Sequence, residues 1–155
     1  MIIREFKSSD AEKIIEVVNE ATYKINSQDY SSSQIEALEP HDPDSIVNFA
    51  KSDEIYYIVA VKEDDVIGAG NIDLDGGEIK GIFVHPKHIR EGVGTSLMEK
   101  LEDMAIRAGK EELKATSTVT AKKFYESQGF EIIEEKVQTI NEIEFEVYDM
   151  KKQID

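Results

Sequence analysis

The chain has 155 residues, 40% of them hydrophobic, and a formal net charge of −15 from 18 basic and 33 acidic side chains. This length predicts a single domain over 1–155 with one core, and the charge argues against nucleic acid as a partner, because binding a phosphate backbone requires a basic face. No cysteine is present and the three histidines are scattered, so we expect neither disulfides nor a metal site.

The chain carries no sign of a membrane or export segment. No apolar run approaches the roughly 20 residues that span a bilayer. The first five residues, MIIRE, lack the shape of a signal peptide. We therefore expect a cytoplasmic protein without a membrane partner.

The first third of the chain predicts one strand and then helices. Residues 1–6 read as a strand, and a Ser-Asp cap opens a helix over 10–25. A polar break over 26–33 precedes two short helices, at 34–38 and 43–50, which serine and proline residues introduce.

Three apolar runs follow, at 55–61, 66–74 and 78–84, with charged or glycine-rich turns between them. Runs of this length that are rich in β-branched residues indicate strands. Because the turns are short, the three strands are expected to form an antiparallel meander.

The last of these strands leads into an unusual turn. Pro86 ends the strand because it brings no N–H group to the ladder. Gly92 and Gly94 then open a helix that runs to about Ala108, with apolar residues recurring every 3.6 positions. A helix start of this kind directs unpaired amides and a helix dipole at one point, where an anion, above all a phosphate, can bind.

The rest of the chain predicts a crossover and a closing hairpin. Gly109 is placed to cap the helix, and 113–116 reads as a strand parallel to 78–84 through a right-handed crossover. Two parallel strands that splay apart leave a ligand cleft at their carboxyl ends. A helix over 118–129 follows, then strands at 131–137 and 143–150. The sequence leaves open whether two chains associate through this hairpin as a homodimer.

Two motifs resemble those of the GNAT superfamily of N-acetyltransferases. Val84-His85-Pro86, followed by Gly92-x-Gly94-Thr95, is similar to the acetyl-coenzyme A loop of that family. The family's leading Gln or Arg falls on Ile89, and Arg90 is the alternative contact one place later. The segment 118–130 resembles the family's second motif, with Thr118 at the position of its Asn.

The resemblance implies a fold and a cofactor. The fold would be α/β (α+β), a GNAT-like mixed, mostly antiparallel sheet of about seven strands flanked by about four helices, with the splayed parallel pair as the cofactor cleft. The cosubstrate would be acetyl-CoA, with no metal. The residues that would hold it are Ile82, Phe83, Val84, Ile89, Arg90, Glu91, Gly92, Val93, Gly94, Thr95, Thr118 and Lys122.

The family also implies the catalytic groups. Tyr125 matches the tyrosine that faces the coenzyme A sulfur and acts as the acid, and a phenol can protonate a departing thiolate. Glu78 matches the catalytic glutamate of histone acetyltransferases, and strand alternation puts it on the face of Ile82 and Val84 if no bulge intervenes. The alternatives are a solvated glutamate, or a water chain as the base.

The acceptor is expected to be a primary amine of a small molecule or a peptide. By resemblance, residues 26–45 would wall its pocket, with Tyr30 and His41 as candidate contacts, although an ordinary connector explains them equally. The two longest acid-free runs, 79–90 and 113–125, coincide with the two motifs, as a basic cleft on an acidic body requires. A non-catalytic acyl-CoA sensing domain on the same fold is the alternative.

Overall fold

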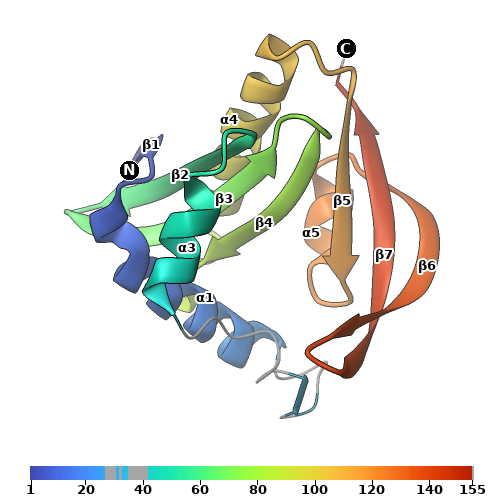
Figure 1. Ribbon diagram of the computed structural model, residues 1–155, viewed down its shortest axis with the longest axis horizontal. Helices are drawn as coiled ribbons and strands as arrows, with labels where there is room; N and C mark the ends of the chain where they lie inside the picture. The colour runs from blue at the N-terminus through green and yellow to red at the C-terminus, as the bar shows by residue number, and fades with distance from the viewer. Residues whose placement is uncertain (27–30, 32, 35–41, 155) are drawn as a thin grey trace.

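The computed structural model describes residues 1–26, 31, 33, 34 and 42–154, and the side chains of 22–26 lie outside that description. Residues 35–38 of the short helix expected at 34–38, and the candidates Tyr30 and His41, fall outside the described residues. A seven-stranded sheet runs through the molecule in the order β1-β2-β3-β4-β5-β7-β6 (Figure 1). The strands are β1 Ile2–Glu5, β2 Ile55–Lys62, β3 Asp65–Asp73, β4 Glu78–Val84, β5 Glu112–Thr118, β6 Glu131–Ile140 and β7 Ile143–Gln153.

The sheet is mixed, as the sequence predicted. Strands β1 to β4 are antiparallel neighbours, which confirms the meander. Strands β4 and β5 are parallel, but they pair only at Glu78 with Lys114 and at Ile79 with Ala115. Beyond those two pairs they diverge, so the expected splayed pair is confirmed (Figure 1).

Four described helices cover the sheet, namely α1 Ala11–Asn26, α3 Pro43–Ala50, α4 Val93–Arg107 and α5 Lys122–Ser127. Figure 1 shows α1 and α3 on one side of β2–β4 and α4 on the other. The apolar stripe of α4 is completely buried at Leu97, Met98 and Leu101. This burial fixes the helix against the sheet and sets the position of its amino end. None of the described helices combines the length and apolar character that crossing a membrane demands.

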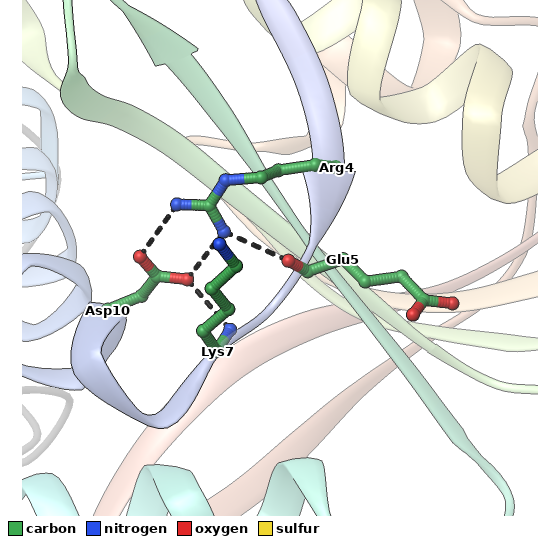
Figure 2. Close-up of polar contacts among 4 residues, drawn as sticks. All are labelled: Arg4, Glu5, Lys7 and Asp10. Atoms are coloured by element: carbon green, nitrogen blue, oxygen red, sulfur yellow. Dashed lines mark hydrogen bonds and ion pairs between the residues drawn. The ribbon is translucent and has the colours of Figure 1, made fainter.

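An ion pair fixes the start of α1 (Figure 2). Two Arg4 nitrogens each donate to one carboxylate oxygen of Asp10 at 2.9 Å, and the Lys7 amide donates to Asp10 at 2.8 Å. Burial alone would raise the pKa of Asp10, but the hydrogen bonds from Arg4 and Lys7 outweigh it and the pKa is lowered. The turn between β1 and α1 is therefore held by a charged contact with a nearly buried carboxylate.

The closing hairpin has a two-residue turn at Asn141 and Glu142, both with positive φ, which suits the twist of paired strands. Along β7 the expected alternation is confirmed, because Phe145 and Val147 are buried while Glu144 and Glu146 are exposed. One face of this strand therefore contributes to a small core and the other faces solvent.

Candidate active site

The divergence of β4 and β5 opens a cavity of about 560 Å³. The loop between β4 and α4, the first turn of α4, the end of β5 and the start of α5 all line it. Of the residues proposed from the sequence, it brings together Ile82, Phe83, Val84, Ile89, Arg90, Gly92, Val93, Gly94, Thr95, Thr118 and Tyr125. The divergence of these two strands thus brings together residues that are far apart in the sequence.

The amino end of α4 opens on this cavity without a side-chain cap. Gly92 takes φ +81° as the capping residue, and the first intrahelical bond runs from the Ser96 amide to its carbonyl at 3.0 Å. The amides of residues 93–95 therefore have no partner inside the helix. The first turn carries no acidic side chain, and Arg90 lines the cavity beside it. This end of the helix can bind an anion.

The two glycines of the loop are required for different reasons. At Gly92 no described atom lies within 4 Å of the position that a Cβ would take, so the positive φ is what favours glycine. At Gly94 a Cβ would lie 3.0 Å from Cε1 of Phe124. Gly94 therefore allows the close packing of α4 against α5.

Glu91 is held away from the cavity, which it does not line. Its carboxylate accepts from Lys62 Nζ at 3.0 Å and lies 3.1 Å from His88 Nδ1. The hydrogen bond from Lys62, with a further one from His88, lowers the pKa of Glu91. These contacts connect the loop to the end of β2. His85 also has a structural contact, because its Nδ1 accepts from the Lys87 amide at 3.1 Å.

Hydrogen bonds join the two helices that flank the cavity. The Thr95 hydroxyl accepts from Gln128 Nε2 at 3.0 Å, which links the first turn of α4 to the end of α5. The Thr118 hydroxyl accepts from the Ala121 amide at 3.2 Å and so caps the turn that leads into α5. Both hydroxyls line the cavity while serving the fold.

Tyr125 is the buried tyrosine of the cavity wall, with 6% of its surface exposed. Phe124 and Phe130 pack edge-on against its ring, with centroids 5.7 and 5.3 Å away. No described residue makes a hydrogen bond to its hydroxyl, and burial raises the pKa of Tyr125. The phenol therefore keeps its proton and has it available for a ligand.

Besides Glu91, two residues proposed from the sequence lie outside this cavity. Lys122 Nζ sits 4.8 Å from the centroid of the Tyr148 ring, as a cation–π contact. Glu78 lines a neighbouring hollow, which shares Thr116 with the cavity, and forms an ion pair with Lys80 at 3.3 Å.

A bulge in β4 changes which side chains share a face. The partners of Asn71 and Ile72 on β3 are Gly81 and Ile79, so Lys80 is an extra residue. Ile79 and Ile82, three apart, consequently pack into the same core. Glu78 was expected to share the face of Ile82 and Val84 only if no bulge intervened, and the bulge at Lys80 rules this out.

Several lining residues were not proposed as site residues. Lys80 and His88 belong to the acid-free run 79–90, and Ser117 and Thr120 to the run 113–125, so that signal could have found them. Ala21 reaches the cavity from α1. No motif marks Ala21, because only the tertiary fold brings it to the cavity.

Comparisons with known proteins agree with this geometry. The structure superposes on a GCN5-related N-acetyltransferase from Rhodopseudomonas palustris with a TM-score of 0.89, at 22% identity over 98% of this chain and 94% of the other. It superposes on PaiA N-acetyltransferase of Thermoplasma acidophilum, solved in complex with coenzyme A, with a TM-score of 0.82, at 20% identity over 98% of each chain.

YncA from Salmonella typhimurium, solved with its cofactor acetyl-CoA, gives a TM-score of 0.73, at 21% identity over all of this chain and 94% of the other. Among curated proteins, none matches the sequence significantly. The sequence family described as Acetyltransferase (GNAT) domain matches residues 26–154. The chain therefore belongs to the GNAT acetyltransferase family.

Proposed function

We propose that this protein is an N-acetyltransferase that moves the acetyl group of acetyl-CoA to a primary amine of a small molecule or peptide, by direct attack in a ternary complex. One observation carries the proposal. One cavity, at the gap between β4 and β5, is lined both by the uncapped end of α4 and by the buried Tyr125. A diphosphate fits the first group and a leaving thiolate fits the second.

The cavity residues suit coenzyme A along its length. The amides of residues 93–95 and the Arg90 side chain supply donors for the diphosphate. The edge of β4 at Ile82–Val84, which faces away from β3 into the gap, supplies main-chain groups for the amides of the pantetheine arm. Thr118 and Lys122 border the same end of α5, although Lys122 must leave Tyr148 to reach a ligand.

The chemistry forms one bond and breaks another. When bound, acetyl-CoA supplies an activated acetyl group as its thioester. The amine nitrogen forms a bond to the acetyl carbonyl carbon while the carbon–sulfur bond breaks, and Tyr125 gives its phenolic proton to the leaving sulfur. An amide N–H near Ile82 polarises the carbonyl. Because no protein group becomes acylated, both substrates must be present together.

The proton lost by the amine needs an acceptor. Glu78 is our candidate, reached through water, because it lines the neighbouring hollow and not the cavity itself. Glu78→Gln is expected to lower kcat/KM at neutral pH by about tenfold or more, since general bases contribute 10²–10⁴-fold and a water chain retains part of this. If Glu78→Gln keeps the natural rate and pH profile, Glu78 is not the base and a water chain alone accepts the proton.

The test of the proposed function is a panel of amines assayed for release of free coenzyme A thiol, with mass spectrometry of the products. Candidate acceptors include amino acids, polyamines, aminoglycosides and basic peptides, and Tyr30 and His41 are our candidate contacts for them. We expect thiol release that depends on one amine class and a product heavier by one acetyl group. Tight coenzyme A binding without turnover on any amine would favour an acyl-CoA sensing domain instead.

A further inference from the structure

Lys80 places an amine in the candidate active site that the proposed reaction does not use. Among the described residues, it is the one lysine that lines the cavity. It is the extra residue of the bulge in β4, and it directly follows Ile79, the last residue of β4 that pairs with β5. Lys80 therefore lies at the point where the two strands begin to separate and the cavity opens.

The amine lies beside the group that we propose as the base. Nζ of Lys80 is 3.3 Å from a carboxylate oxygen of Glu78, and contacts between catalytic groups are often this long before substrates bind. Solvent reaches both side chains, which are 40% and 35% exposed, so the ion pair contributes little to stability. Strand β4 thus supplies both an amine and a carboxylate that can accept its proton.

Lys80 is also close to the position proposed for the thioester. That position is beside the amide near Ile82, two residues further along β4. Two residues of a strand span roughly 7 Å, and the long, flexible stem of a lysine covers a similar distance. A change of rotamer in Lys80 can therefore bring its Nζ to the acetyl carbon.

We propose that the enzyme, with acetyl-CoA bound and no amine acceptor present, acetylates its own Lys80 within the same chain; this inference rests on the proposed function. The Lys80 ammonium first gives one proton to Glu78 and through it to water. The amine nitrogen then forms a bond to the acetyl carbonyl carbon while the carbon–sulfur bond breaks, and its second proton leaves by the same route. Tyr125 protonates the sulfur and regains its proton from water.

The products are an acetylated Lys80, free coenzyme A and one proton released to solvent. Acetylation removes the positive charge of Lys80 and with it the ion pair to Glu78. The reaction therefore modifies the site at the residues that border the opening between β4 and β5.

Lys114 provides a matched comparison within the same protein. It lies on β5 opposite Glu78, and its Nζ is 3.9 Å from a carboxylate oxygen of Glu112. Its side chain is 59% exposed, more than that of Lys80, but it lines the neighbouring hollow and not the cavity. Acetylation that depended on exposure alone would favour Lys114, whereas acetylation inside the cavity favours Lys80.

Mass spectrometry of the intact protein and of its peptides, after incubation with acetyl-CoA and no amine, tests the proposal. We expect Lys80 to be acetylated at least about tenfold faster than Lys114, because the cavity holds the amine and the thioester together. The rate per chain should not depend on protein concentration. Lys80→Arg should remove this fast acetylation and leave the slow acetylation of Lys114 as it was.

A mixture of two variants distinguishes reaction within a chain from reaction between chains. Gly92→Val keeps Lys80 but is expected not to bind acetyl-CoA, while Lys80→Arg keeps the loop before α4 but lacks the amine. In the mixture, Lys80 of the Gly92→Val chain should be acetylated no faster than when that variant is incubated alone. Faster acetylation there, or equal rates at Lys80 and Lys114 in the natural protein, would overturn the proposal.

The same experiment separates this inference from the proposed function. Thiol release with an added amine, but no fast acetylation of Lys80, would overturn the inference alone. Failure of both reactions would remove the proposed function as well.

Discussion

Helices α4 and α5 both begin close to the point where a strand of the parallel pair ends, yet their first turns differ. At α4 a glycine with positive φ precedes the helix and no side chain caps it. At α5 no side chain caps the helix either, but the Thr118 hydroxyl accepts from the amide of Ala121, the residue just before the helix. The first helix thus begins at a glycine beside the cavity, while the turn before the second is held by Thr118 and that helix contributes a side chain, Tyr125, to the cavity wall. In the proposed mechanism, α4 therefore binds the anion and α5 supplies the proton.

The largest effect is expected at the start of α4. Gly92→Val should abolish acetyl-CoA binding, measured by calorimetry, because a branched side chain at φ +81° distorts the loop and occupies the space above the free amides. Gly109→Val is the matched control. Gly109 has φ +82°, and no described atom lies within 4 Å of its Cβ position either, so the strain, about 1–3 kcal/mol, is shared.

Gly109 ends the same helix but lies outside the cavity. The Gly109→Val variant should therefore bind acetyl-CoA as the natural protein does. Equal loss of binding in both variants would mean that backbone strain, and not the ligand site, explains the result. Retention of binding by Gly92→Val would remove the argument for an anion site at α4.

The next effect is at α5. Tyr125→Phe should lower kcat by about 10²–10⁴-fold, the usual contribution of a general acid, while affinity for coenzyme A changes less than about twofold. Tyr57→Phe, at a buried tyrosine in the other core, should leave kcat unchanged. A parallel loss of turnover and affinity in Tyr125→Phe would assign the ring to packing alone.

The pH dependence of turnover also tests Tyr125 as the general acid. Burial raises the pKa of Tyr125 above its ordinary value of 10.0, so the protonated phenol, which is the active form of an acid, persists to higher pH than in free tyrosine. Turnover by the natural enzyme should therefore show no alkaline decline below about pH 10. A decline centred near pH 8 that disappears in Tyr125→Phe would contradict this assignment.

A smaller effect is expected from the turn before α5. Thr118→Val removes the hydroxyl that accepts from the Ala121 amide and should lower the free energy of unfolding by about 0.5–1.5 kcal/mol, the usual contribution of one hydrogen bond. Thr118→Ser should restore most of it. If Thr118→Val instead weakens coenzyme A binding with no change in denaturant midpoint, the hydroxyl serves the ligand and not the helix.

The smallest effect concerns the contact that holds the loop before α4. Lys62→Met removes the donor to Glu91 and should raise the KM for acetyl-CoA by about two- to fivefold without changing kcat, because solvent screens an exposed ion pair and limits its contribution. Glu91→Gln in the same background should add little more. Additive effects of the two substitutions in this cycle would show that the pair does not act as a unit.

Local rules in the sequence account for much of the fold. The apolar runs and glycine turns predicted the meander, and the strand–helix–strand pattern predicted the parallel pair of β4 and β5. What could not be predicted depends on neighbours in space. The bulge at Lys80 depends on pairing with β3, so no periodicity in β4 itself reveals it.

The same distinction holds for the candidate site, where motifs predicted some residues and long-range contacts determine others. The glycine loop and Tyr125 are placed by short-range motifs and lie together in the cavity. By contrast, Lys122 was assigned from the second motif and the acid-free run around it, and neither reveals the Tyr148 ring that it contacts. Gly94 appears in the loop motif, but its close contact is with Phe124, thirty residues further along the chain. Long-range packing therefore modifies roles that a motif can only suggest.

A crystal structure of the protein with coenzyme A tests the central claim most directly. The account predicts diphosphate oxygens within about 3.2 Å of the amide nitrogens of residues 93–95, and the coenzyme sulfur within hydrogen-bonding reach of the Tyr125 hydroxyl. A ligand bound elsewhere, or a diphosphate that leaves the start of α4 untouched, would contradict it.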